Sequence, residues 1–166
     1  MAIKDSFLPE FDHEMGSTRR VLERTPEADF GWKPHQKSHS LGQLAGHIAN
    51  LPRWLGLICE HSEIDVAVAA EEARPRVPAS EQDLLDTFDE NVKRARRYID
   101  ELGDSAMMAR WTLRSGSQEI LSMPRAAVLR SFVLNHLIHH RGQLTVYLRL
   151  RDVPLPSLYG PTADEG

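Results

Sequence analysis

The sequence predicts an all-α protein, a four-helix bundle formed by a single domain over residues 1–166. Apolar residues recur at three- and four-residue spacing in four long stretches, as amphipathic helices require. Proline and glycine, which interrupt helices, gather between these stretches. No pair of strands long enough to form a core is evident, so the apolar helix faces must cover one another. The length suits one domain with a proper core.

The first two helices are expected on either side of a loop, residues 25–39, that contains two prolines and a glycine. The first helix is expected over residues 5–24, and its apolar face comprises Phe7, Phe11, Met15, Val21 and Leu22. The second helix starts after Ser40, whose side chain is suited to cap a helix N-terminus. Its inward face comprises Leu44, His47, Leu51, Trp54, Leu55 and Ile58. Pro52 lacks a backbone N–H and predicts a kink or a broken turn within this helix.

A long connection with one short helix is expected over residues 62–79, which Pro75 and Pro78 interrupt. The third helix is expected to begin at Ser80, because Asp83 three positions on forms a weaker relative of the capping box. Its buried face comprises Leu84, Leu85, Phe88, Val92, Ala95, Ile99 and Leu102.

The fourth helix is expected to follow a short non-helical segment. Residues 111–123 predict a small hairpin or an extended crossover, with Gly116 at the turn. The helix is expected to begin near Pro124, which a first helical turn tolerates, and to run to about Arg151. The connections on either side of the third helix are long enough for crossovers, so helical spacing alone leaves the order of helix directions open.

Composition excludes several classes of protein. The net charge of −4 and the pI of about 6.1 indicate no basic face for nucleic acid. No stretch approaches the ~20 apolar residues of a membrane span, and the N-terminus lacks the apolar run of a signal peptide. The single cysteine, Cys59, excludes an internal disulfide framework and predicts a reducing, cytoplasmic environment.

Three histidines stand within five positions of "NHLIHHRGQL", residues 135–144. At about 100° per residue, His136 and His140 lie near the middle of the apolar stripe of the fourth helix. That stripe comprises Leu129, Phe132, Val133, His136, Leu137, His140, Leu144 and Tyr147. His139 lies toward its edge, and Arg141 points away from it. Two imidazoles four positions apart can reach one ion, but two core histidines with hydrogen-bond partners explain the pattern equally well.

A third histidine on another helix favours the metal interpretation. His47 lies on the inward face of the second helix, whereas His13 lies off the apolar face of the first. His35 and His39 flank a Pro-Lys loop, where four-residue spacing has no geometric meaning. The candidate metal ligands are therefore His47, His136 and His140.

Three segments carry a family resemblance, namely "GWKPHQKSHSLGQLAGHIANLPRW", "NHLIHHRGQLTVYLRL" and "PLPSLYGP". They resemble the DinB/YfiT-like family of metalloenzymes, and the resemblance covers essentially the whole chain. It implies an antiparallel bundle in up-down-down-up order and a homodimer. It also implies a divalent ion, nickel or zinc, held by His47, His136 and His140. His139 matches an additional histidine of the family, which is expected to support the ligands or the structure.

Three neutral histidines leave a metal ion its positive charge and an open position, which is typical of catalytic sites. Related families include thiol transferases and a mycothiol-dependent isomerase. The resemblance therefore favours a transferase whose small-molecule substrate is a low-molecular-weight thiol, activated at the metal. The alternatives are a metal-dependent hydrolase and a non-catalytic metal-binding or sensing protein.

Acid–base help for hydrolysis has no obvious source in the sequence. Leu137 stands where the HExxH motif of metalloproteases places its glutamate. Asp12 and Glu14 on the first helix are candidates, although solvated or capping roles explain both. Arg141 is expected either to contact a substrate anion or to be solvated.

Overall fold

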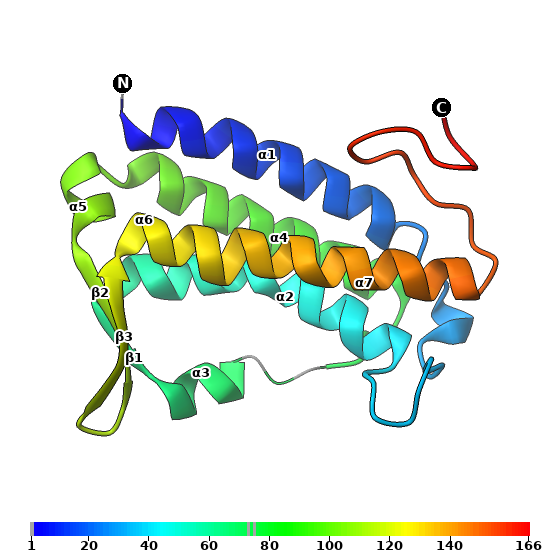
Figure 1. Ribbon diagram of the computed structural model, residues 1–166, viewed down its shortest axis with the longest axis horizontal. Coiled ribbons are helices and arrows are strands. Elements are labelled where there is room, and N and C mark those ends of the chain that lie inside the picture. Colours follow the sequence, from blue (N-terminus) through cyan, green and yellow to red (C-terminus); the bar gives the residue numbers. More distant parts are fainter. Residues whose placement is uncertain (1, 73, 75) are drawn as a thin grey trace.

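The computed structural model describes residues 2–72, 74 and 76–166, and within them the chain is mostly helical (Figure 1). The long helical segments are α1 (Ile3–Leu22), α2 (Leu41–Glu60), α4 (Glu81–Glu101) and a last one that comprises α6 (Arg125–Val128), the π-helical η2 (Leu129–Asn135) and α7 (His136–Leu150). The shorter elements are η1 (Glu27–Asp29), β1 (Glu63–Asp65), α3 (Val66–Glu72), α5 (Asp104–Met108), β2 (Arg110–Ser115) and β3 (Gln118–Pro124).

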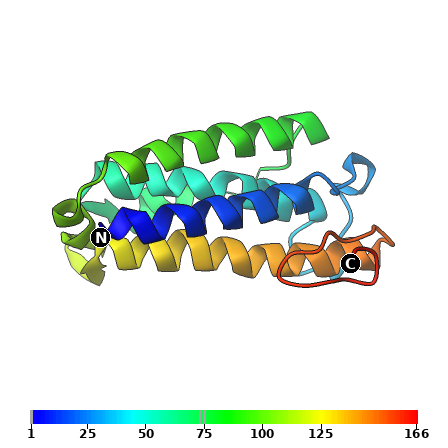
Figure 2. The ribbon, with the colours of Figure 1, turned by 90° about the horizontal axis from the view of Figure 1, so that it is seen from above.

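The long segments lie side by side along the long axis of the molecule (Figures 1 and 2). α1 and the α6–α7 segment run in one direction, and α2 and α4 run in the other. α2 contacts both α4 and α7, and α1 contacts the same two helices. Because α2 and α4 run in the same direction, the chain must return along the molecule between them. Residues 61–80 make that return through β1 and α3.

The expected all-α class is wrong, because the chain also forms a small three-stranded sheet with the order β1-β2-β3. β2 and β3 form the antiparallel hairpin predicted around Gly116, whose φ is +56°. β1 pairs in parallel with β2, and its Ile64 stands opposite Leu113. The turn residue Gly116 allows the hairpin to be predicted from the sequence. The strand β1 cannot be predicted in this way, because three residues are too few to show the alternation of a strand.

The predicted starts of α2 and α4 are confirmed by their capping hydrogen bonds. Ser40 Oγ accepts from the Gln43 backbone N–H at 3.1 Å, and the Gln43 side chain accepts from the Ser40 N–H at 2.9 Å. Ser80 Oγ accepts from the Asp83 N–H at 3.1 Å. Each bond satisfies a donor that the first helical turn leaves without an intrahelical partner.

Other helix predictions need correction. α1 begins at Ile3 and ends at Leu22, slightly earlier than expected at both ends. α2 continues through Pro52 as one helix, so of the kink or broken turn expected there, the broken turn is wrong. Pro75 lies outside the described residues. The last segment contains the π-helical η2, where turns hold more residues than in an α-helix, so the assumption of 100° per residue fails there. Phe132, expected inside, is consequently 38% exposed.

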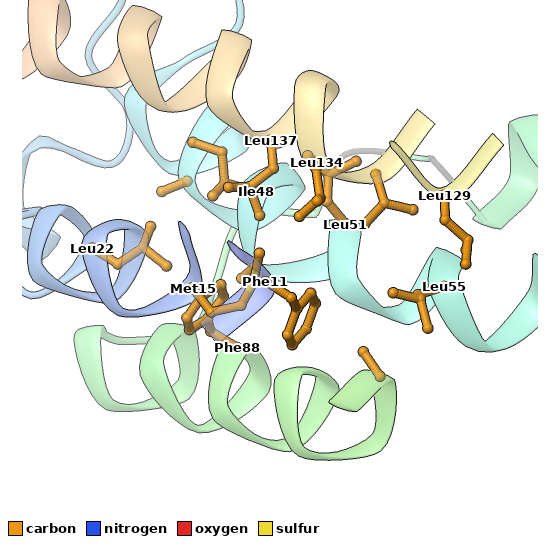
Figure 3. Packing of buried hydrophobic residues seen from close by; sticks show 14 of the residues in the cluster. Phe11, Met15, Leu22, Ile48, Leu51, Leu55, Phe88, Leu129, Leu134 and Leu137 are labelled. Carbon is orange, nitrogen blue, oxygen red and sulfur yellow. The ribbon is translucent and has the colours of Figure 1, made fainter. Parts of the chain in front are cut away.

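Apolar side chains from all the long segments meet in one core (Figure 3). Phe11 of α1, Leu51 of α2, Phe88 of α4 and Leu134 of η2 are each at most 2% exposed. Burying one such side chain stabilises the fold by roughly 1.5–3 kcal/mol relative to leaving it in water. This close packing fixes α2 and α7 relative to each other, and the candidate site depends on that spacing.

The outer face of α4 is polar. The buried residues of α4 are Leu84, Phe88, Asn91, Ala95 and Ile99, and charged side chains such as Glu90 and Lys93 are exposed.

In the described part of the chain, no helix combines the length and the apolar character that crossing a membrane requires.

Candidate metal centre

Three histidines from two helices converge where α2 meets α7. His47 belongs to α2, and His136 and His140 stand one turn apart on α7. His136 Nε2 lies 2.8 Å from His140 Nε2 and 3.5 Å from His47 Nε2. One ligand nitrogen from each ring lies within 4.8 Å of the other two. The structure therefore brings together the three residues that spacing and resemblance select.

The histidines lie at the edge of the buried face of α7 rather than in its middle. The middle is occupied by Leu137, Arg141, Leu144 and Leu148, which are almost completely buried. His47, His136 and His140 are each half-buried. In this position the packed core holds the backbone of α7 in place, and the imidazoles are accessible from one side.

A hydrogen bond orients the imidazole of His140. His140 Nδ1 lies 2.7 Å from Gln143 Oε1, which can only accept, so Nδ1 carries the proton. The backbone carbonyl of Phe132 raises the pKa of His136, although burial has the larger, opposite effect. His140 is then left with an unprotonated Nε2, which faces the cluster. Partners of this kind fix the tautomer of metal-ligating histidines in other proteins.

The cluster has the electrostatics of a cation site. Burial lowers the pKa of His136 and of His140, so both rings are neutral at pH 7 and no proton supplies a positive charge. The Nε2 atoms of His136 and His140 lie 2.8 Å apart, close enough for one shared proton or one cation to bridge them. A tetrahedral ion about 2.0–2.1 Å from each nitrogen holds them about 3.3 Å apart, which lies between the two separations observed. The donor set therefore fits a divalent ion.

The two sides of the cluster differ in polarity. On one side, His47 and His136 line a pocket of about 240 Å³ whose other walls are Trp54, Ala69, Ala70 and Phe132. Gln143, His139 and the exposed His39 lie near His140 outside this pocket. The cluster thus has apolar neighbours beside His47 and His136 and polar neighbours beside His140.

His139 is expected to be dispensable for metal binding. Its side chain is exposed, and its ring centre lies 4.9 Å from that of His140 without joining the cluster of three. His139→Ala should therefore retain the metal, with a loss of affinity of at most roughly 10–100-fold. Isothermal titration with Zn²⁺ would measure this, and a loss as complete as in His140→Ala would show that the ligands are assigned wrongly.

The charge of Arg141 suggests a side chain in solvent. Arg141 is instead buried, with 1% of its surface exposed. Its Nη2 lies 2.7 Å from a carboxylate oxygen of Glu14, which is also buried. Nη1 donates to the Glu14 carbonyl and to Thr18 Oγ1, and the Tyr159 hydroxyl donates to the Glu14 carboxylate. Glu14 is therefore neither solvated nor part of the cluster, and Arg141 is not placed to contact a substrate anion.

The remaining candidates lie outside the cluster. Asp12 is exposed and pairs with Arg96 of α4. His13, His35 and His61 are exposed. Burial raises the pKa of the Cys59 thiol to about 12, which makes it a poor nucleophile or ligand. Sequence reasoning missed Gln143, although its position three residues after His140 on one helix is a readable signal.

A mostly helical protein with three convergent histidines on two of its helices defines a class of candidate metalloproteins. The family model described as "DinB family" matches residues 1–166, so the chain belongs to the DinB family.

Relatives agree with this assignment. The chain is 25% identical over 165 residues to the uncharacterised protein YrdA of Bacillus subtilis (strain 168), covering 97% of this chain and 90% of YrdA. A solved DinB-like protein from Bacillus cereus ATCC 10987 shares the fold with a TM-score of 0.74 and 22% identity over 95% of this chain and 98% of that one. The DinB-like protein YjoA of Bacillus subtilis matches with a TM-score of 0.70 and 18% identity over 95% and 99% of the two chains. At these identities the solved structures support the fold alone.

Proposed function

We propose that this DinB-family protein is a metal-dependent transferase that activates a low-molecular-weight thiol. In this proposal the long helical segments form the antiparallel four-helix bundle of the family, and His47, His136 and His140 hold a nickel or zinc ion. The observation that supports it best is the cluster itself, in which one nitrogen from each of the three imidazoles lies within 4.8 Å of the other two.

A divalent ion bound by three neutral imidazoles keeps its full charge and supplies the means to hold a thiol as its thiolate or to acidify a water molecule. The chain contributes orientation and an apolar surface. Gln143 holds the ring of His140. Trp54 and Phe132 present apolar surface beside the ligands.

The surroundings favour thiol activation over hydrolysis. Hydrolysis by metal sites commonly needs a carboxylate as general base. Among the described residues, no carboxylate joins the cluster or lines the adjoining pocket. Glu14 is bound to Arg141 and Asp12 to Arg96, so neither is free for that role. A thiol substrate brings its own nucleophile and needs no such base.

An activity screen of the nickel- and zinc-loaded protein tests the proposal. Glutathione, cysteine and 2-mercaptoethanol would each be offered with an electrophile such as chlorodinitrobenzene, and the thioether product would be measured. Turnover that requires both the thiol and His140 is the expected result, with His140→Ala as the control. Turnover of esters with water alone would favour the hydrolase, and stoichiometric metal without turnover of either kind would favour a binding or sensing protein.

A further inference from the structure

A second hollow lies between α2 and α4, whereas the histidine cluster lies between α2 and α7. Its volume is about 290 Å³, which is room for on the order of ten water-sized groups. Its lining residues include two arginines, Arg53 of α2 and Arg94 of α4, and no histidine. The hollow is therefore separate from the candidate metal centre, and its chemistry is that of guanidinium groups.

Contacts between the two helices place the arginines level with each other. Asn91 Nδ2 donates to the Ala49 carbonyl at 3.0 Å. Two turns further along both helices, the Tyr98 ring lies so close to Gly56 that a Cβ on Gly56 would come within 3.0 Å of it. The offset along the chain is the same in both contacts, so α2 and α4 run in register. The two arginines therefore stand between these contacts, one on each side of the hollow.

Small side chains leave the space between the arginines open. Gly56 has no side chain, and Ala95, which is 1% exposed, presents a single methyl group. Polar groups stand at the two ends of the hollow. Asn91 lies at one end, and Glu60, which accepts a hydrogen bond from the Tyr98 hydroxyl, lies at the other. The hollow thus has positive charge in its middle and hydrogen-bond acceptors at its ends.

The two guanidinium groups are unequally paired. Arg53 lies 2.6 Å from a carboxylate oxygen of Glu72. Within the described part of the chain, Arg94 has no carboxylate at ion-pair distance, although Glu90 precedes it by about one helical turn. Two positive charges at the same level repel each other, and an anion between them would remove that repulsion. The hollow therefore has the charge distribution of an anion site.

The placement of the guanidinium groups distinguishes between kinds of anion. The two oxygens of a carboxylate lie in one plane, and a single guanidinium group can bind both. The terminal oxygens of a phosphate monoester are spread around phosphorus, so guanidinium groups on opposite sides can each bind it. We propose that this hollow binds a small hydroxylated phosphate ester, with the phosphate group between Arg53 and Arg94. Asn91 and Glu60 accept hydrogen bonds from the hydroxyl groups of the same molecule.

Isothermal titration of the zinc-loaded protein with glycerol 3-phosphate, glycerate and glycerol tests the proposal. These ligands share a short hydroxylated carbon chain and carry a phosphate, a carboxylate or no charge. Glycerol 3-phosphate should bind saturably at millimolar concentration and more tightly than glycerate, and glycerol should give no measurable binding. The absence of saturable binding of glycerol 3-phosphate, or an equal affinity for glycerate, would overturn the proposal.

A matched pair of variants on α4 assigns the binding to the hollow. Arg94 is exposed, so Arg94→Gln should fold, and it should weaken the binding of glycerol 3-phosphate at least about tenfold. Lys93→Gln removes the same charge from the neighbouring position, but Lys93 does not line the hollow. It should change the affinity no more than about twofold, because water and salt screen its charge. Equal losses in both variants would indicate diffuse attraction to a basic helix and would contradict a specific site.

Binding of the phosphate to the metal is distinguished by a variant of the cluster. His140→Ala should bind glycerol 3-phosphate as tightly as the wild type does, because the hollow lies between α2 and α4 and contains none of the three histidines. Loss of binding in His140→Ala would place the phosphate at the metal and overturn the proposal, while the metal centre itself would stand.

Discussion

Alanine at His136 or at His140 is expected to abolish stoichiometric binding of nickel or zinc while leaving the protein helical. Either change leaves two imidazoles, too few for the three protein ligands typical of a catalytic site. The fold should survive because both side chains are only half-buried and lie at the edge of the core. Elemental analysis of the purified variants would fall from about one ion per chain to almost none, with far-ultraviolet circular dichroism as the measure of fold.

A control variant guards against a general effect of losing a histidine. His61 is exposed and lies outside the cluster, so His61→Ala should keep the full metal content. Unchanged metal content in either His136→Ala or His140→Ala would contradict the site.

The second large effect is expected from Arg141→Met, which leaves the Glu14 carboxylate buried without a cation. Removing one partner of a buried ion pair typically costs about 3–5 kcal/mol, because the remaining charge is neither paired nor hydrated. Both side chains of this pair are almost completely inaccessible, at 2% and 7%. Urea unfolding in the presence of a chelator would measure the loss in free energy of unfolding without a contribution from bound metal.

Arg96→Met supplies the matched control, because Arg96 pairs with Asp12 on the same helix as Glu14 but in an exposed position. Its effect on the free energy of unfolding should be far smaller, since water screens that pair. The double variant with Glu14→Gln and Arg141→Met should recover part of the lost stability, because no buried charge remains. A loss in Arg141→Met no larger than in Arg96→Met would show that the buried pair contributes little.

Local signals account for what the sequence predicts about the fold. Ser40 and Ser80 mark helix starts because a cap and its partner lie three residues apart. The strand β1 has no comparable signal, because its partner is a strand nearly fifty positions away, as the pairing of Glu63 with Thr112 shows. The π-helical η2 is also invisible to a pattern that assumes a constant helical period.

The site likewise combines residues that local spacing predicts with residues that only the fold brings together. His136 and His140 are readable from their four-residue spacing, whereas His47 joins them only because the fold packs α2 against α7. The sequence predicts Arg141 either at a substrate anion or in solvent, because an arginine without a visible partner is seldom buried. Its partner Glu14 lies 127 positions away, so only the structure reveals the buried pair.

The participation of His47 is the central claim, since without it two histidines on one helix remain and bind divalent ions only weakly. Melting temperatures of the wild type and of His47→Gln, each with zinc and with chelator, test it most directly. Comparing each protein with its own chelated form removes the effect of the substitution on packing. An ion at 100 times its dissociation constant stabilises the native state by about 2.7 kcal/mol. Chelation should therefore lower the melting temperature of the wild type clearly and that of His47→Gln hardly at all, whereas equal lowering in both proteins would contradict the three-histidine site.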